Sequence, residues 1–193
     1  MADESKPFLA LEFHPLTSER WPDLERLFGP NGACGGCWCM WWRLTAAQFQ
    51  KQKGPGNREA LKSIVESGEV PGIIAYSQDA PVGWCSLAPR EAYPRLERSR
   101  TLKRVDDKPV WSVVCFFVAK PWRRKGVTEA LLEAAREYAA NRGAHLLEAY
   151  PVESRGTIPD AFAYTGLAST FRKAGFDEVL RRSPKRPIMR KAL

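Results

Sequence analysis

The stretch from residue 111 to residue 132, WSVVCFFVAKPWRRKGVTEALL, constrains the fold more than any other stretch of the chain. Its first eight residues are mostly apolar, aromatic or β-branched, a pattern typical of a buried strand. After Gly126, apolar residues recur at helical spacing. We therefore predict a strand, a short basic turn and a helix in immediate succession.

The turn carries three cations, Arg123, Arg124 and Lys125, followed by Gly126. Amides in the first turn of a helix have no partner within the helix, and together with the helix dipole they favour an anion. The glycine lets the backbone approach that anion closely. The turn predicts a site for a phosphate-bearing ligand, and the alternative that it leaves open is an ordinary connection through a solvated basic loop.

Length and composition favour one globular domain over residues 1–193, because a chain that is 44% hydrophobic and 27% charged can bury a sizeable core. The first ten residues, MADESKPFLA, lack the basic start and apolar core of a signal peptide. No apolar run approaches the roughly 18 residues that a membrane helix needs. We therefore expect a cytoplasmic protein without a membrane partner.

The net charge of +8 and the pI of about 9.4 favour an acidic partner: a nucleotide cofactor, a nucleic acid or an anionic substrate. A nucleic-acid-binding module would use the basic carboxyl-terminal residues, Arg181, Arg182, Lys185, Arg186 and Arg190. Alternating strand residues and an interrupting proline favour a solvated pair of strands there. Nucleic acid is therefore not the partner that we expect.

Elsewhere, hydrophobic periodicity and turn residues predict further strands and helices. Asn57 is expected to cap the second of two helices between residues 45 and 68. The charged segment 91–108 is expected to be a solvated loop, and the alternative that it leaves open is the border of a ligand cleft. The other predicted elements are strands at 8–13, 72–77, 81–88 and 145–152, helices at 17–28 and 126–141, and a final short helix followed by two strands.

The segment 31–43, NGACGGCWCMWWR, concentrates rare residues. Cys34 and Cys37 have the spacing of metal ligands, and Cys39 would supply a third thiolate, but no second CxxC pair follows. Without a secretory signal we expect reduced thiols, and we predict no metal site. The three tryptophans, Trp38, Trp41 and Trp42, leave two roles open: the wall of a binding pocket, or a plug that closes the core.

Two motifs resemble those of a known family. VAKPWRRKGVTEALL, residues 118–132, is similar to the acyl-coenzyme A pyrophosphate loop of the GNAT-superfamily N-acetyltransferases. The signature of that loop is Arg or Gln, two residues, Gly, one residue, then Gly or Ala, and these positions hold Arg123, Gly126 and Thr128. ASTFRKAGFDEV, residues 168–179, resembles the superfamily's last helix and strand, where the helix runs into a Gly-Phe pair.

The resemblance implies an α/β (α+β) fold with a mixed, mostly antiparallel central sheet of about six to seven strands flanked by helices. The strand that ends at Val118 and the strand that begins near His145 are expected to splay apart and form the cleft for acetyl-CoA, the implied co-substrate. Pantetheine would pair with the first strand and the pyrophosphate would bind the turn. The implied cofactor-binding residues are Phe116, Phe117, Val118, Arg123, Arg124, Lys125, Gly126, Val127 and Thr128.

The implied activity is direct transfer of an acetyl group to a primary amine of a small-molecule or peptide acceptor, by a monomer or homodimer. The helical amino-terminal region, residues 1–70, would border the acceptor, and residues 72–193 would supply the sheet and the cofactor site. The segment between the first two helices then lies on the acceptor side, so we expect acceptor contacts from Trp38, Trp41, Trp42 and Cys37.

Two departures from the family pattern affect the chemistry. Thr128 replaces the usual Gly or Ala, and Phe171 replaces the tyrosine that protonates the departing thiolate in many members. We predict Glu148 as the proton acceptor, with an exposed or ion-paired strand carboxylate as the alternative. Tyr164 and Tyr150 are the candidate substitutes for the missing acid. The absent tyrosine also leaves open a degenerate member that binds coenzyme A as a sensor or scaffold.

Overall fold

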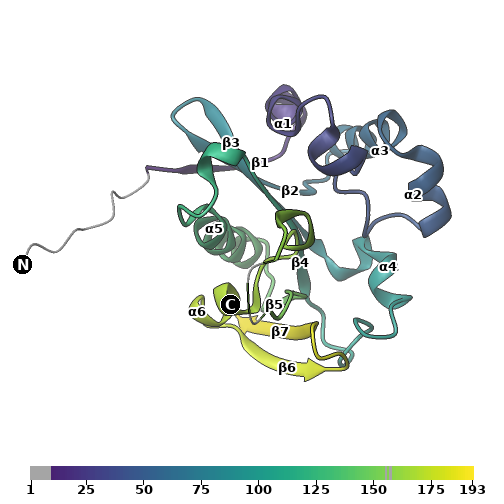
Figure 1. Ribbon diagram of the computed structural model, residues 1–193, viewed down its shortest axis with the longest axis vertical. Helices are drawn as coiled ribbons and strands as arrows, with labels where there is room; N and C mark the ends of the chain where they lie inside the picture. Colours follow the sequence, from purple (N-terminus) through teal and green to yellow (C-terminus); the bar gives the residue numbers. More distant parts are fainter. Residues whose placement is uncertain (1–9, 155, 157) are drawn as a thin grey trace, which may run out of the picture.

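The computed structural model describes residues 10–154, 156 and 158–193, and its centre is a seven-stranded sheet with the order β1-β2-β3-β4-β5-β7-β6 (Figure 1). Most neighbouring strands are antiparallel, whereas β4 and β5 run parallel. The predicted fold class is therefore confirmed. The strands are β1 (Glu12–Pro15), β2 (Gly72–Ser77), β3 (Ala80–Pro89), β4 (Trp111–Val118), β5 (Leu146–Ala149), β6 (Asp177–Arg181) and β7 (Pro187–Ala192).

Helices cover both faces of this sheet (Figure 1). A parallel pair of strands needs a crossover connection, and α5 (Val127–Asn141) provides it between β4 and β5 while packing against β2, β3 and β4. On the other face α1 (Trp21–Phe28) packs against β3, beside α2 (Ala46–Gln52) and α3 (Pro55–Glu66). A short helix, α6 (Ala168–Lys173), precedes β6.

The alternation of side chains along each strand divides the core in two. On β2, Ile73 and Ala75 join the apolar cluster under α5, whereas Ile74 and Tyr76 join the cluster under α1. Gly83 of β3 brings α5 close to the sheet, since a Cβ there would lie 2.9 Å from a methyl group of Val127. The first turn of α5 is therefore held near the end of β4.

The amino-terminal elements differ in detail from the prediction. β1 begins at Glu12, and Phe8 and Leu9 of the predicted strand lie outside the described residues. Asn57 does not cap a helix, because α3 already begins at Pro55 and the buried Asn57 side chain donates a hydrogen bond to the carbonyl of Gly36 at 3.0 Å. The prediction of a cap at Asn57 was therefore wrong.

The segment 91–108 is also not the solvated loop that its charges predicted. It contains the short helix α4 (Pro94–Glu97), and its apolar side chains Tyr93, Leu96 and Leu102 are buried in the core. β5 is shorter than the predicted strand 145–152. Charged residues dominate the composition of segment 91–108, but its few apolar side chains fix its position.

β4 and β5 pair only over three residues and then diverge. The pairs join Trp111–Val113 to Leu147–Ala149, and β4 continues alone on that side to Val118. The register between β3 and β4 shifts immediately after Val113, which leaves Val114 as an extra residue in β4. Such a bulge bends a strand. The splay between these two strands, expected from the resemblance, is therefore present.

A buried ionic network lies at the base of this splay. Glu148 is fully buried, and its carboxylate accepts hydrogen bonds from Arg90 Nη1 at 2.6 Å, Arg190 Nε at 2.7 Å and the Tyr150 hydroxyl at 2.6 Å. The hydroxyl of Ser112, the partner of Glu148 across the two strands, lies 2.8 Å from that of Tyr150. The network therefore joins β4 to β5 where they last pair.

Further ion pairs extend the network outward. Arg90 also binds Glu97 through Nε at 2.7 Å and the carbonyl of Leu102 through Nη2 at 2.9 Å. Arg190 of β7 pairs with Asp106 at 2.7 Å. These interactions with Glu97, Leu102 and Asp106 hold the segment 91–108 against the base of the splay.

Replacing Glu148 by glutamine should destabilise the fold strongly. Glu148→Gln keeps the shape of the side chain but leaves two buried guanidinium groups without their shared charge, and breaking a buried ion pair in this way costs about 3–5 kcal/mol. The free energy of unfolding, measured by chemical denaturation, gives the difference. Glu69→Gln is the matched control, because Glu69 is exposed, and its cost should stay within about 0.5 kcal/mol. A cost for Glu148→Gln as small as that of the control would contradict the structural role.

Candidate active site

The basic turn lies at the amino-terminal end of α5. Gly126 is the N-cap of α5 and has a left-handed backbone with φ of 85°, and Arg124 also has a positive φ of 61°. Apart from the neighbouring residues of the chain, no described atom lies within 4 Å of the place where a Cβ at Gly126 would stand. The space in front of the first turn of this 15-residue helix is therefore open at Gly126.

Cations surround this open space. Arg124 and Lys125 are exposed, and Lys125 Nζ lies 5.4 Å from the centre of the Trp122 ring. Arg123 Nε donates to the carbonyl of Val118 at 3.0 Å, which ties the turn to the end of β4. Open space, free helix amides and positive charge are what a pyrophosphate group requires, so the residues of this turn fit coenzyme A.

The edge of β4 beyond the splay is partly occupied by the chain itself. The amide of Phe116 donates to the carbonyl of Tyr164 at 2.6 Å, and the amide of Val152, just beyond β5, donates to the carbonyl of Gly166 at 2.9 Å. The segment from Tyr164 to Gly166 therefore bridges β4 and the continuation of β5. Val118 is two residues beyond Phe116, so its backbone faces the same edge.

Phe171 fills the position of the missing tyrosine with an apolar ring. It is fully buried, and its ring centre lies 6.1 Å from that of Phe116 and 5.1 Å from that of Phe176. All three belong to the apolar cluster under α5. A proton donor for the thiolate must therefore come from a different residue.

Tyr164 lies on the opposite side of β4. Its half-buried side chain packs against the cluster under α1, and burial raises its pKa to about 12 despite the opposing positive charges of Arg186 and Arg95. The thiols of Cys115 and Cys37 are also close enough to act on the Tyr164 pKa. Tyr164 therefore combines a protonated hydroxyl with a place beside the splay.

Glu148 and Tyr150, the other two predicted catalytic residues, belong to the buried network. Burial and the charge of Glu148 raise the Tyr150 pKa well above its usual value, so this phenol stays neutral. Both oxygens of the Glu148 carboxylate hold hydrogen bonds, and both side chains are fully buried. Direct contact with an amine requires the network to open, so the roles predicted for these two residues stay predictions.

The three tryptophans of segment 31–43 differ in their exposure to solvent. Trp38 is buried, stacks on Trp21 with ring centres 6.0 Å apart and meets Phe28 edge to face at 5.5 Å. Trp42 is buried in the same cluster. Trp41 is 37% exposed, and the guanidinium of Arg95 lies 3.8 Å from its ring centre. Trp38 and Trp42 thus close the core, and only Trp41 stands at the surface.

Two cysteines of segment 31–43, Cys37 and Cys39, are packed as neutral thiols. Burial raises the Cys37 pKa to about 11, so its thiolate is scarce at neutral pH. Cys39 Sγ lies 3.3 Å from Cys115 Sγ and accepts a hydrogen bond from Trp84 Nε1 at 3.0 Å. All five cysteines are free. Within the described residues, no group of three or more His, Cys, Asp or Glu side chains could hold a metal ion.

Several of the basic carboxyl-terminal residues are engaged in contacts with other parts of the chain. Arg181 pairs with Glu153 and Glu178, Arg182 donates to main-chain carbonyls of the segment 91–108, and Arg190 binds the buried Glu148. A surface that recognises phosphates would present such charges to solvent. These contacts therefore do not favour a nucleic-acid interface.

The sequence model of the acetyltransferase (GNAT) family matches residues 38–157, which is more than half of the chain. The chain belongs to this family. The resemblance carried by the two motifs is therefore confirmed, and acetyl-CoA is the co-substrate that membership implies. A comparison with curated proteins finds no match.

Solved structures of GNAT enzymes share the fold. An acetyltransferase from Listeria monocytogenes superposes with a TM-score of 0.59 at 9% identity, over 95% of each chain. The PaiA N-acetyltransferase from Thermoplasma acidophilum, solved with coenzyme A, gives 0.53 at 13% identity, over 95% of this chain and 99% of that one. An acetyltransferase from Thermus thermophilus gives 0.53 at 17% identity, over 96% and 98% of the two chains. Identities this low establish the fold alone.

Sequence reasoning did not single out Arg90, and it placed Arg95 and Arg98 in a charged segment without assigning a role to either. Arg90 is a buried member of the network, and the other two line a surface pocket. Their charge suggested solvent exposure, and no local pattern marked them.

Among the described residues no helix is both long and apolar enough to cross a membrane.

Alanine substitutions should separate the tryptophan of the core from that of the surface. Trp38→Ala removes a buried ring and should lower the free energy of unfolding by about 3–5 kcal/mol. Trp41→Ala should lower it by about 1 kcal/mol or less, and should raise KM for the acceptor while leaving the affinity for acetyl-CoA unchanged. Denaturation, calorimetry and initial rates measure these effects. The acceptor role of Trp41 is excluded by an unchanged KM and acceptor profile in a folded variant.

Proposed function

We propose that this GNAT protein is an N-acetyltransferase that transfers an acetyl group from acetyl-CoA to a primary amine of a small-molecule or peptide acceptor. The observation that carries the proposal is the open, basic turn at the start of α5, placed directly beyond the splayed edge of β4. Acetyl-CoA supplies the acetyl group as a thioester, whose C–S bond breaks as the bond to the amine nitrogen forms. The residues of the chain then have to place the amine, hold the donor and move protons.

Tyr164 is the proton donor that we assign to the departing thiolate. Its phenol stays protonated over the physiological range because its pKa is raised to about 12. The backbone of the same residue lies against the edge of β4 through the bond from Phe116. The Tyr164 hydroxyl therefore belongs to the segment that borders the splay. Phe171 has no hydroxyl and cannot donate a proton.

The amine must lose a proton before or during its attack. In this proposal that proton leaves to water, and Glu148 receives it only when the bonds from Arg90 and Arg190 open. The substrate contacts that we propose for the acceptor come from Trp41 at the surface and from Cys37, which lies near Tyr164.

The cofactor contacts and the wider organisation belong to the same proposal. Pantetheine would use the edge of β4 at residues 116–118, and the turn 123–128 would hold the pyrophosphate. We also propose one domain over residues 1–193, with residues 1–70 beside the acceptor, acting in the cytoplasm as a monomer or homodimer. The pairing of β1 with β2 supports the single domain, because it joins the amino-terminal region to the main sheet.

A coenzyme A sensor or scaffold without turnover is the second candidate. The observation that favours it is the apolar Phe171, where a catalytic hydroxyl is absent. Release of free thiol that depends on an added amine would exclude this candidate.

Charge at Gly126 should control the affinity for acetyl-CoA. Gly126→Asp places a carboxylate against the pyrophosphate site, and repulsion should weaken binding about 100-fold or more. Gly126→Asn is the matched control, because it has nearly the same size, tolerates the left-handed backbone and carries no charge. Calorimetric titration with acetyl-CoA measures both. Equal affinities of the two variants would refute the placement of the pyrophosphate.

Removing the hydroxyl of Tyr164 should slow the reaction. Tyr164→Phe should lower kcat about 100-fold or more with little change in acetyl-CoA affinity, since positioned proton donors contribute about 10²–10⁴ in rate. Tyr138→Phe is the control, because its hydroxyl is buried without a described partner and lies on α5. Because the raised pKa keeps the Tyr164 hydroxyl protonated, kcat should not fall through deprotonation of Tyr164 between about pH 8 and 10. A kcat equal to that of the control would remove Tyr164 from the mechanism.

A further inference from the structure

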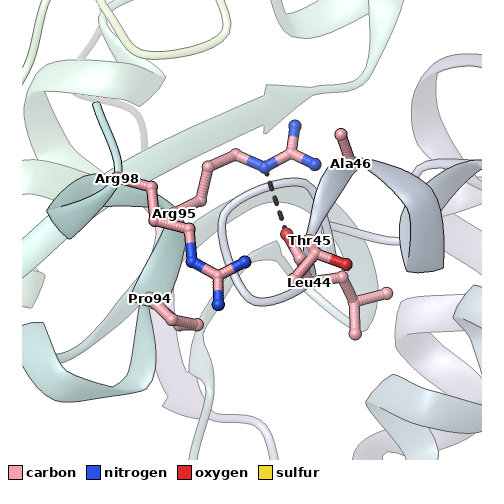
Figure 2. Close-up of a pocket in the computed structure, with 6 residues that line it drawn as sticks. All are labelled: Leu44, Thr45, Ala46, Pro94, Arg95 and Arg98. Carbon is pink, nitrogen blue, oxygen red and sulfur yellow. Dashed lines mark hydrogen bonds between the residues drawn. The ribbon is translucent and has the colours of Figure 1, made fainter. Parts of the chain in front are cut away.

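A surface pocket of about 350 Å³ lies between the start of α2 and α4. Figure 2 shows the two sides of this pocket, formed by the residues just before and at the start of α2 and by residues in and after α4. Its lining residues are Leu44, Thr45, Ala46, Pro94, Arg95 and Arg98. Two of the six are arginines and none is acidic. The pocket is therefore positively charged, with an apolar floor.

Arg95 is fixed in place but not fully bonded. Its Nε donates to the carbonyl of Leu44 at 3.1 Å (Figure 2), and its guanidinium stacks over Trp41. Its Nη2 is buried without a hydrogen-bond partner among the described residues. Burial lowers the pKa of Arg95, as expected for a guanidinium held without a counter-charge.

Arg98 has no described partner at all. It is exposed at the C-cap of α4, and no ion pair or hydrogen bond joins its side chain to a described residue. The one acidic residue of α4, Glu97, is already engaged by Arg90 at 2.7 Å and by Arg104 at 3.2 Å. The charge of Arg98 is therefore available to a ligand.

A third guanidinium close by in the chain is also incompletely bonded. Arg43 lies over the ring of Tyr93 at 4.8 Å, and its Nε and Nη2 are buried without a partner among the residues that the structure describes. A buried donor left unpaired costs about 1–3 kcal/mol, and native structures rarely keep one without a reason. Arg43 is not among the residues that line the pocket, so its charge adds to the positive potential beside the pocket without contact to a ligand there.

The pocket is electrostatically linked to the proposed reaction centre. The charge of Arg95 acts on the hydroxyl of Tyr164 and lowers its pKa against the effect of burial. Trp41, under the Arg95 guanidinium, belongs to the segment that carries Cys37, another neighbour of Tyr164. Leu44, which lines the pocket, and Tyr164 also pack against the same apolar cluster, the one under α1.

We propose that this pocket binds a compact oxyanion, a carboxylate or a phosphate, on the acceptor itself, so that the preferred acceptor is an amine that carries a negative charge. Guanidinium groups suit this task because their fixed N–H forks match the oxygens of both anions. The inference rests on the proposed acetyl transfer for the identity of the ligand. The anion site itself can be tested without turnover.

The test compares matched pairs of amines that differ in the anionic group: β-alanine with β-alaninamide, and phosphoethanolamine with ethanolamine. Initial rates of thiol release are measured at fixed ionic strength and related to the concentration of free amine. The anionic member of at least one pair should have a kcat/KM about tenfold higher or more. The pair with the larger ratio distinguishes a carboxylate site from a phosphate site.

Arg98→Gln is the decisive variant, because Arg98 is exposed and its loss should not affect folding. It should reduce the preference for the anionic amine about tenfold, through KM, while kcat for the neutral amine stays unchanged. Arg100→Gln is the matched control, two residues further on and also exposed, and it should keep the preference. A wild-type enzyme that prefers the neutral amines, or equal preferences in the two variants, would overturn the anion site but leave the acetyltransferase intact.

A binding measurement separates the two proposals if no amine is acetylated. The protein is saturated with coenzyme A and titrated calorimetrically with each amine. Binding of phosphoethanolamine or β-alanine that Arg98→Gln weakens and Arg100→Gln does not would support the anion site and reject the proposed transfer. The absence of such binding would reject the anion site as well.

Discussion

The buried carboxylate of Glu148 is the constraint on which the rest of the structure depends. A carboxylate without solvent is tolerated only when cations and hydrogen bonds compensate its charge, so Arg90 and Arg190 have to meet it. Arg90 follows β3 and Arg190 lies in β7, which brings three strands of the sheet to one point. Because Glu148 lies one residue before the last pair of β4 with β5, the network holds the two strands together up to their divergence. The bulge at Val114 then bends β4 away from β5.

This geometry separates two kinds of chemistry on the two faces of β4. Phe116 faces the cluster under α5, together with Phe171 and on the same face as the basic turn. Cys115, its neighbour in the chain, faces the cluster under α1, where Tyr164 also packs. Because successive side chains of a strand point in opposite directions, one strand can carry donor contacts on one side and acceptor contacts on the other. In the proposed reaction the donor and the acceptor would therefore approach from opposite faces of the sheet and meet at the splay.

Much of the fold was predictable because its signals are local. The strand, the turn and the helix of residues 111–132 follow from periodicity and from one glycine, and the hairpin β2–β3 from a short polar link. The network was not predictable, since Arg90 and Glu148 are 58 residues apart and neither carries a local mark of its partner. The cap predicted at Asn57 failed for the same reason, because its real partner is the carbonyl of Gly36.

The structural features of the proposed site were predictable to different degrees. The donor side depends on backbone conformation at a single turn, which glycine and helix periodicity reveal. The acceptor side depends on which of several tryptophans and arginines reach the surface, and that is decided by packing. Trp38 and Trp41 are three residues apart in one segment, yet one ring is in the core and the other is exposed under Arg95. Composition singled out the segment but could not show which of its tryptophans is buried and which is exposed.

With Phe171 in place of the tyrosine that many family members carry, the proposed proton donor, Tyr164, lies on the same edge of β4 that the acetyl donor would use. An acid on α6 would be held by a helix, independently of the edge of β4. Tyr164 instead occupies that edge with its own carbonyl, which accepts the amide of Phe116. A donor that pairs with Phe116 therefore has to displace Tyr164, whereas a donor that pairs with Val118 leaves it in place. Because the carbonyl and the hydroxyl belong to one residue, the proposed role of Tyr164 as the acid favours pairing of the donor at Val118, which leaves the bond between Phe116 and Tyr164 intact.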